Sequence, residues 1–205
     1  MKVALFFGSF NPITVGHMIV AHTALQDTNV DRVCFVVSPG NPSKIKKGIL
    51  IDPYHRLEMA KLAIKNVDGF NVSDIEFKIH ETGKPSFTHH TLKRLREDFP
   101  NWEFPILCGS DTQQMIAVWK NSNEIVLNHK TIHYPRNFTP IKLKPNSDSL
   151  KRFCEIKKNE TLITAPNLDI SSTYIRDRIK YGFDVTYLVP REVSNYINKH
   201  KLFQL

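Results

Sequence analysis

Ten consecutive residues, GSFNPITVGH at positions 8–17, combine the residue types that bind phosphate. Gly8 and Gly16 allow a ligand to approach the backbone closely, and Thr14 and His17 can donate hydrogen bonds from their side chains. A helix is expected to begin at His17, so its unpaired amides and positive dipole end would face the same anion. The segment therefore indicates phosphate binding. The alternative is a structural strand-to-helix turn that contains glycine and histidine.

Two common phosphate-binding motifs are excluded for this segment. It has no GK[ST] sequence, so it is not a Walker A loop, and it lacks the third glycine of GxGxxG.

A second segment, DISSTYIR at positions 169–176, also combines groups that bind anions. Ser171, Ser172 and Thr173 stand where a helix is expected to begin, with Ser172 as its N-cap. Arg176 follows one turn later on the same face, so amides, hydroxyls and a guanidinium would point toward one anion. The alternative is a well-capped surface helix.

Shorter segments lie between these two. In PGNPSKIKKG (39–48), Lys44 could reach a phosphate from a loop after a strand, whereas Lys46 and Lys47 are expected to be solvated charges. In the tripeptide GSD, which begins at Gly109, Asp111 could accept hydrogen bonds from ribose hydroxyls.

Trp119 has two interpretations. It is either a core aromatic residue, which composition favours, or an exposed ring that stacks on a planar ligand.

The pattern of apolar residues predicts the elements that position these segments. Continuous apolar runs predict strands at 3–7, 32–38, 104–109 and 131–134, and an interrupted strand-like segment at 70–77. Helical spacing, N-caps and prolines predict helices at 17–26, at 53–64 after Asp52, at 88–99, from Asp111, at 173–181 and from Pro190 to 200. Residues 135–145, with three prolines, are expected to form a surface loop, and 162–170 two short extended pieces.

Strands that alternate with helices predict an α/β fold, a Rossmann-like doubly wound and mostly parallel sheet with helices on both faces. Ligands of such sheets bind outside the carboxyl ends of the strands, where the strand order reverses. The length of 205 residues predicts a single domain, 1–205, with a small C-terminal helical part from about residue 171.

The composition favours an anionic partner. Lys and Arg number 28 against 20 Asp and Glu, a net charge of +8, which suits nucleic acid, a membrane surface or a phosphorylated small molecule. No apolar run approaches the roughly 18 residues of a membrane span, and the opening apolar run is too short for a signal peptide. A cytoplasmic protein is therefore expected. The three cysteines show no CxxC pairing, which predicts neither a disulfide framework nor a zinc site.

The two main segments resemble known signatures. GSFNPITVGH resembles the GSFxPxxxGH signature, containing (T/H)xGH, of the nucleotidylyltransferase superfamily, and ISSTYIR resembles its ISSTxIR signature. Within the superfamily the chain is most similar to the nicotinate mononucleotide adenylyltransferase family. Further matches are PSK, ETGKPSFTHHTL, GSD, the Trp119–Lys120 pair and VTYLVPREVSNYI. The chain departs from the family pattern in having Phe7 and Thr14 where many members have glycine and histidine, in having Asn11 for Asp, and in lacking RPG after Arg136.

The resemblance implies an activity and a set of site residues. Members of this family transfer AMP from ATP to nicotinate mononucleotide and form deamido-NAD and pyrophosphate. The implied catalytic residues are Thr14, His17, Lys44 and Arg176. The implied ATP-binding residues are Gly8, Ser9, Phe10, Gly16, Gly109, Asp111, Ser171, Ser172 and Thr173. The implied mononucleotide-binding residues are Phe87, Thr88, Trp119 and Arg136.

The resemblance also implies the cofactor and partners. Magnesium would be held mainly by ATP oxygens, with no metal site formed by the protein. The expected partners are ATP and nicotinate mononucleotide, with no nucleic acid and no membrane, and a homo-oligomer is compatible with the sequence. His89 and His90 receive no role and are expected to be structural or solvated.

Alternatives remain at this level. The acceptor could be nicotinamide mononucleotide or another phosphorylated compound such as phosphopantetheine, although the phosphopantetheine enzymes are shorter and lack ISSTxIR. A noncatalytic nucleotide- or RNA-binding module would also explain the basic surplus. The sequence has no RNA-binding aromatic motif, and the presence of His17 and Arg176 favours an enzyme.

Overall fold

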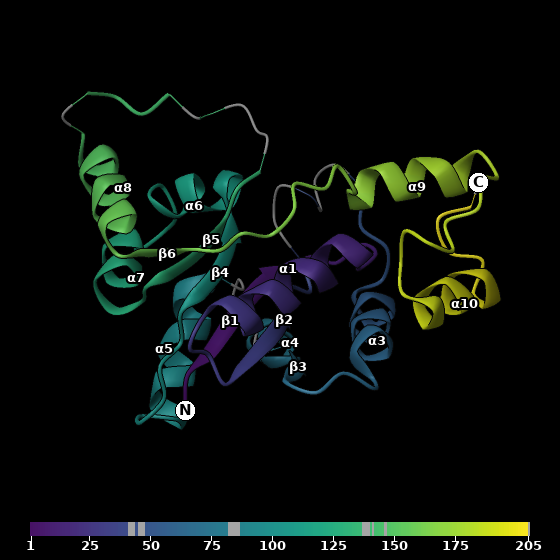
Figure 1. Cartoon of the computed structure of the whole chain (residues 1–205), viewed down its shortest axis with the longest axis horizontal. Coiled ribbons are helices and arrows are strands. Elements are labelled where there is room, and N and C mark those ends of the chain that lie inside the picture. The colour runs from purple at the N-terminus through teal and green to yellow at the C-terminus, as the bar shows by residue number, and fades with distance from the viewer. Residues whose placement is uncertain are drawn as a thin grey trace. The chain divides into compact units, whose positions relative to one another are not determined.

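The computed structural model describes residues 1–40, 44, 48–81, 87–136, 140, 142–145 and 147–204, with only the backbone of 80 and 81. Its described residues form six strands in the order β3-β2-β1-β4-β5-β6 (Figure 1). The strands are β1 (Val3–Gly8), β2 (Arg32–Val37), β3 (Phe70–Ser73), β4 (Ile106–Gly109), β5 (Thr131–Tyr134) and β6 (Glu160–Leu162). The pairs β1–β4, β4–β5 and β5–β6 are parallel. This order is typical of the doubly wound α/β fold, which confirms the predicted fold class.

The helices lie between and after these strands. They are α1 (Val15–Asp27), α3 (Pro53–Ile64), α4 (Ile75–Glu81), α5 (Thr88–Asp98), α6 (Ser110–Ile116), α7 (Ser122–Asn128), α8 (Asp148–Lys158), α9 (Ser172–Lys180) and α10 (Arg191–Lys199). Among the residues that the structure describes, no helix is both long and apolar enough to cross a membrane.

The chain divides into two compact units. Unit 1 consists of Met1–Phe7, Val20–Cys34 and Phe87–Asn167, and unit 2 of Gly8–Ile19, Phe35–Ser86 and Leu168–Leu205. The chain passes from one unit to the other within β2 and α1 and at the end of β1. The organisation as a single domain, 1–205, stays a prediction.

Unit 1 contains the parallel strands β4, β5 and β6. Helix α6 packs against β4, β5 and α8, and α7 packs against α5 and α8. Ile106, Leu107, Ile116 and Ile125 are at most 2% exposed and form part of its core. Residues of β4 and β5 are paired in register from Ile106 opposite Thr131 onward, so both strands end at the same edge.

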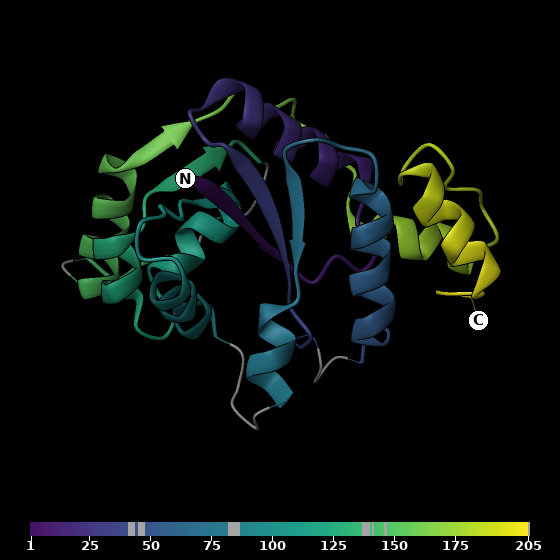
Figure 2. The ribbon, with the colours of Figure 1, turned by 90° about the horizontal axis from the view of Figure 1, so that it is seen from below.

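Unit 2 contains α3, which packs against β3 and α10 (Figure 2). The predicted start of α3 is confirmed, because Asp52 Oδ1 accepts the amide of Tyr54 at 2.7 Å and Pro53 is the first helical residue. His55 of α3 and the Tyr196 hydroxyl of α10 are 2.8 Å apart.

Several predicted boundaries are wrong because a hydroxyl caps the helix at another residue. Helix α1 begins at Val15, two residues before the predicted start at His17, and Thr14 Oγ1 accepts the His17 amide at 3.3 Å. Helix α9 is capped by Ser171 rather than by Ser172, since Ser171 Oγ accepts the Tyr174 amide. The side chain of Ser172 is thereby left for another contact.

The strand expected over 70–77 ends at Ser73, and a helix follows from Ile75. Ser73 Oγ accepts the Ile75 amide at 3.2 Å, which helps the chain turn there. In the expected extended segment 162–170, only Leu162 belongs to a strand, because β6 ends there.

Helices α7 and α8 were not predicted from the sequence. In α8 Leu150, Phe153 and Ile156 recur every three residues, and Ser147 Oγ accepts the Leu150 amide at 3.2 Å, so the sequence carries local signals for this helix that the prediction missed.

Candidate nucleotide-binding site

In unit 2 the loop after β1 has a strained, closely packed backbone. A Cβ atom on Gly8 would lie 2.7 Å from Cζ of Phe10, so this position requires glycine. Phe10 has a φ of 43°, in the left-handed region that non-glycine residues rarely adopt. Its ring is 3% exposed and lies edge-on to the His17 ring, with centroids 5.2 Å apart. Phe10 can therefore offer a ligand its backbone but little of its side chain.

Contacts with Thr14 fix the orientation of His17. The Thr14 amide donates to His17 Nδ1 at 3.0 Å, and Thr14 Oγ1 lies 2.8 Å from the same nitrogen. Because a backbone amide can only donate, Nδ1 is an acceptor and the ring proton is on Nε2. His17 thus carries an N–H group that can donate to a phosphate oxygen, while Thr14 is fully buried beneath it.

Lys44 contacts the same loop. Its Nζ donates to Ser9 Oγ at 3.1 Å, and the side chain is half-buried. Lys46 and Lys47, which the sequence assigns to solvent, lie outside the described residues.

The first turn of α9 reaches the loop from the other end of the sequence. Ser172 Oγ donates to the Pro12 carbonyl at 2.8 Å, and Arg176 Nη1 donates to the Asn11 carbonyl at 2.9 Å. The second nitrogen, Nη2, donates to Thr173 Oγ1 at 3.2 Å. Burial lowers the pKa of Arg176, which nearby Asp177 partly opposes. The two signature segments are therefore in direct contact, about 160 residues apart in sequence.

Arg56 braces this loop, and the sequence interpretation missed it. It is 0% exposed, and Nη1 donates to the carbonyl of Ser9 at 2.7 Å and to that of Ser38. Nη2 donates to the Pro39 carbonyl and Nε to that of Ile51 at 3.3 Å. One guanidinium thus joins the loops that follow β1 and β2.

The charge of Arg56 survives burial. Burial lowers its pKa to about 10, with partial opposition from Asp52, so the guanidinium stays protonated at neutral pH. The available signal in the sequence was an arginine beside the apolar stripe of α3, where Leu57 and Ala60 are buried.

In unit 1, Asp111 and Arg136 form a second polar group. Arg136 Nη1 lies 3.7 Å from Asp111 Oδ2. Asp111 Oδ1 is buried and has no hydrogen-bond partner among the described residues. A Cβ atom on Gly109 would lie 2.8 Å from that oxygen and 3.1 Å from Cζ of Tyr134, so any other residue here would displace the Asp111 carboxylate.

The remaining predicted residues of unit 1 are half-buried. Thr88 begins α5, and the Phe87 ring before it lies 5.1 Å from Lys120 Nζ. Trp119, in the turn after α6, is half-buried and therefore not part of the core.

The structure sorts the predicted residues between the two units. Unit 2 holds Gly8, Ser9, Phe10, Thr14, Gly16, His17, Lys44, Ser171, Ser172, Thr173 and Arg176, which the contacts above gather around one loop. Unit 1 holds Phe87, Thr88, Gly109, Asp111, Trp119 and Arg136. Within the described ranges, no group of three or more His, Cys, Asp or Glu side chains could hold a metal ion.

The doubly wound sheet has glycine at the ends of β1 and β4, and the start of α9, with Arg176, contacts the loop after β1. This arrangement is typical of nucleotide-binding proteins. Comparison with known proteins gives the family. Residues 5–178 match the cytidylyltransferase-like family model. The chain is 39% identical to a probable nicotinate-nucleotide adenylyltransferase of Cytophaga hutchinsonii, with 99% of this chain and 98% of that protein covered. It is 38% identical to one from Flavobacterium johnsoniae, with both chains fully covered.

The chain belongs to the cytidylyltransferase-like family, among the proteins named nicotinate-nucleotide adenylyltransferases. Its fold is similar to that of the solved Plasmodium falciparum nicotinic acid mononucleotide adenylyltransferase complexed with NaAD. The TM-score is 0.76 at 24% identity, covering 98% of this chain and 97% of the other.

Proposed function

We propose that this chain is a nicotinate-nucleotide adenylyltransferase, which transfers AMP from ATP to nicotinate mononucleotide and releases pyrophosphate. The contact of α9 with the loop after β1 carries the proposal. Ser172 and Arg176 bind the carbonyls of Pro12 and Asn11, so hydroxyl, guanidinium and imidazole donors gather around one glycine-containing loop.

The donors of unit 2 would bind the ATP phosphates. His17 would donate from Nε2, and Lys44 and Arg176 would neutralise the charge that develops on the leaving pyrophosphate. Thr14 would act mainly by orienting His17. Other ATP contacts would come from the backbone or hydroxyl groups of Gly8, Ser9, Phe10, Gly16, Ser171, Ser172 and Thr173.

The reaction itself needs no protein nucleophile. A phosphate oxygen of the mononucleotide attacks the α-phosphorus of ATP, and the bond from that phosphorus to the oxygen bridging the α- and β-phosphates breaks. The protein's task is to align the two polyanions and stabilise negative charge on the leaving group. A net charge of +8 suits this task.

The residues of unit 1 would recognise the nucleosides. The Asp111 carboxylate would accept hydrogen bonds from ribose hydroxyls, next to Gly109. Trp119 would stack on the pyridine ring, and polar groups at Phe87 and Thr88 would contact its 3-substituent. Arg136 would add positive charge near the mononucleotide.

Magnesium would enter with ATP. Bound to the phosphate oxygens, it neutralises part of their charge. The proposed phosphate ligands of the protein are hydroxyls, amides and cations, so the metal would be coordinated by the phosphate oxygens of ATP. We also propose that the protein acts in the cytoplasm, without a nucleic acid or membrane partner. Light scattering would measure whether it forms a homo-oligomer.

A coupled pyrophosphate-release assay with ATP, magnesium and nicotinate mononucleotide tests this function, with the dinucleotide product identified by mass. Formation of deamido-NAD is expected. ATP binding without product from any mononucleotide would instead support the noncatalytic nucleotide-binding alternative, and product from phosphopantetheine alone would change the acceptor class.

A further inference from the structure

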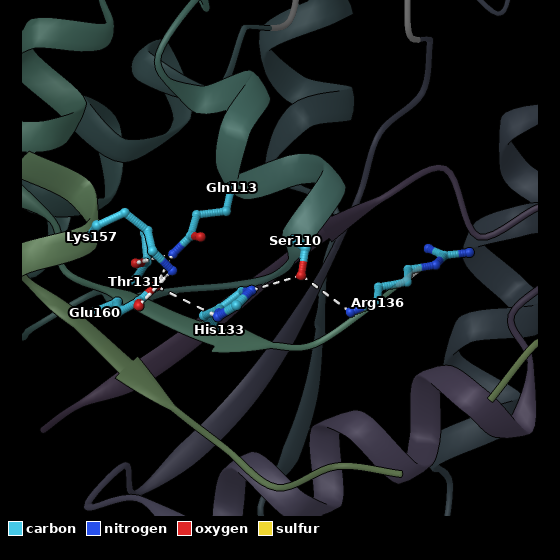
Figure 3. Close-up of polar contacts among 7 residues, drawn as sticks. All are labelled: Ser110, Gln113, Thr131, His133, Arg136, Lys157 and Glu160. Atoms are coloured by element: carbon cyan, nitrogen blue, oxygen red, sulfur yellow. Dashed lines mark hydrogen bonds and ion pairs between the residues drawn. The ribbon is translucent and has the colours of Figure 1, made fainter. Parts of the chain in front are cut away.

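A chain of polar groups crosses the interior of unit 1 from β6 to the residues that follow β5. Ser110 Oγ lies 2.9 Å from His133 Nε2, and His133 Nδ1 lies 3.5 Å from Glu160 Oε2 (Figure 3). At the other end, the Arg136 amide donates to Ser110 Oγ at 3.1 Å. Ser110, His133 and Glu160 come from α6, β5 and β6, in which α6 packs against β5 and β5 pairs with β6.

Two links of this chain are hydrogen bonds. The Arg136 amide can only donate, so Ser110 Oγ accepts from it. The serine hydroxyl donates to His133 Nε2 when that nitrogen is unprotonated and accepts from it when it is protonated, because the oxygen has two lone pairs. With Nε2 unprotonated, the imidazole proton is on Nδ1, which lies 3.5 Å from Glu160 Oε2 and has no hydrogen-bond partner among the described residues.

The charges around His133 favour that neutral form. Lys157 of α8 donates to Glu160 at 2.7 Å, and Gln113 of α6 also donates to it. Burial alone would raise the pKa of Glu160, but these two hydrogen bonds outweigh it and lower the pKa. Burial lowers the pKa of His133, and Lys157 adds to this while Glu160 opposes it. On β4, the thiol of Cys108 stands opposite His133, and burial raises its pKa, so it is neutral.

Such a network is costly to bury, and apolar side chains would pack the same space without that cost. What it fixes is the backbone at Arg136. Ser110 also directly precedes Asp111, whose carboxylate pairs with the Arg136 side chain. Ser110 therefore contacts the backbone of Arg136 and is the sequence neighbour of Asp111.

We propose that Ser110, His133 and Glu160 form a positioning relay that holds Arg136 and Asp111 in the geometry that binds the nucleotide substrates, and that protonation of His133 loosens it. This inference rests on the proposed function, in which Arg136 and Asp111 contact substrate. The three relay residues themselves are positioning residues rather than catalytic ones.

Protonation acts through the serine. With a proton on Nε2, His133 becomes a donor to Ser110 Oγ, so the serine proton loses its acceptor and must turn away from the imidazole. The oxygen then accepts from two donors, and this rotation of the hydroxyl weakens its hydrogen bond with the Arg136 amide. Acid therefore weakens substrate binding through Arg136.

The first experiment measures amide hydrogen exchange at Arg136 by NMR in the full chain at pH 7.5. Ser110→Ala should speed exchange of this amide about fivefold, the scale of one neutral hydrogen bond. Ser110→Thr keeps the hydroxyl and should restore protection. Equal exchange in the wild type and Ser110→Ala would overturn the relay. This result does not depend on catalysis, so it remains informative if the wild type forms no dinucleotide and the proposed function fails.

The second experiment measures KM for nicotinate mononucleotide between pH 7.5 and 5.5. In the wild type KM should rise on acidification. His133→Gln keeps an acceptor for Ser110 but cannot titrate, so it should keep a near-normal KM at pH 7.5 and lose the pH dependence. His133→Leu removes the acceptor and should raise KM about fivefold at pH 7.5 with little change in kcat.

A matched control is His129, another buried histidine of unit 1, whose Nδ1 lies 2.9 Å from the Phe104 carbonyl. His129→Leu should leave KM and its pH dependence unchanged. The proposal is overturned if His129→Leu raises KM as His133→Leu does, or if His133→Gln retains the wild-type pH profile.

Discussion

His17 can act on ATP through one ring nitrogen, because Thr14 occupies the other. Replacement with alanine removes a donor that is oriented before substrate arrives. We expect His17→Ala to lower kcat by about a hundredfold, the usual scale for loss of one transition-state donor, with an unchanged melting temperature. Steady-state kinetics beside a thermal melt checks this.

The control for His17 is His22, which is exposed on the same helix. His22→Ala should leave kcat near that of the wild type. Near-normal turnover in His17→Ala would remove His17 from the catalytic residues.

Arg56 acts on the backbone rather than on substrate, so its loss should affect stability first. Arg56→Met would leave the carbonyls of Ser9, Ser38 and Pro39 without their donor. Leaving such groups unpaired in the interior costs about 3 kcal/mol of unfolding free energy. Urea unfolding should show this loss, whereas Arg191→Met, at an exposed arginine, should change stability by at most about 0.5 kcal/mol. Equal small effects would contradict the bracing role.

At the scale of single residues, the sequence predicted side chains that lie within a local pattern. The donors of GSFNPITVGH and ISSTYIR stand within a few positions of each other, so their types and spacing suffice. Arg56 could not be predicted this way, because its partners are backbone carbonyls in separate loops. His133 is similar, since its neighbours Ser110 and Glu160 are brought together only by sheet pairing.

Among the helices, α9 carries two arginines that make different contacts. Arg176 binds the Asn11 carbonyl in the loop after β1, whereas Arg178 lies over the rings of Tyr174 and Phe183. Charge reversal should therefore affect ATP binding at Arg176 and not at Arg178. Arg176→Glu should weaken binding of a nonhydrolysable ATP analogue at least about tenfold, because a repelling carboxylate replaces a charged donor, and Arg178→Glu should leave affinity unchanged. Calorimetric titration distinguishes them, and equal affinities in both variants would make α9 only a structural helix.

The same contrast between local and distant signals appears in the elements. Buried strands and α3 were predicted because apolar runs, Asp52 and Pro53 are local signals. Helix α8 is an exception, because it was missed although its cap at Ser147 and the spacing of Leu150, Phe153 and Ile156 are local signals. The start of α9 was misplaced by one residue because adjacent serines can both cap, and only the contact of Ser172 with Pro12 distinguishes them.

For the molecule as a whole, buried histidines predict acid sensitivity. Burial lowers the pKa of His89, His129 and His133 below that of an exposed histidine. As pH falls through about 6.5, the unfolded chain takes up protons that the folded chain does not. The free energy of unfolding should therefore fall between about pH 7 and 5, before carboxylates titrate.

Urea unfolding at several pH values measures that dependence. His129→Gln should reduce the slope of stability against pH, whereas His22→Gln, at the exposed position, should not. A slope that is the same in both variants and the wild type would show that the buried histidine is not its source.

Acceptor choice depends on how the whole molecule distributes charge around the pyridine ring. Nicotinate and nicotinamide mononucleotides differ only at the 3-substituent, a carboxylate in one and a neutral amide in the other. Lys120 lies over the ring of Phe87, the residue before Thr88, and Arg136 belongs to the same unit. A carboxylate makes stronger hydrogen bonds in such a field than an amide does.

We expect kcat/KM for nicotinate mononucleotide to be at least about tenfold higher than for nicotinamide mononucleotide, equivalent to roughly 1.4 kcal/mol. Competition of both mononucleotides in one reaction, with the two dinucleotides quantified, measures this ratio. Lys120→Met should reduce the preference if the charge supplies it, and equal or reversed yields in the wild type would contradict the assignment of nicotinate mononucleotide as the preferred acceptor.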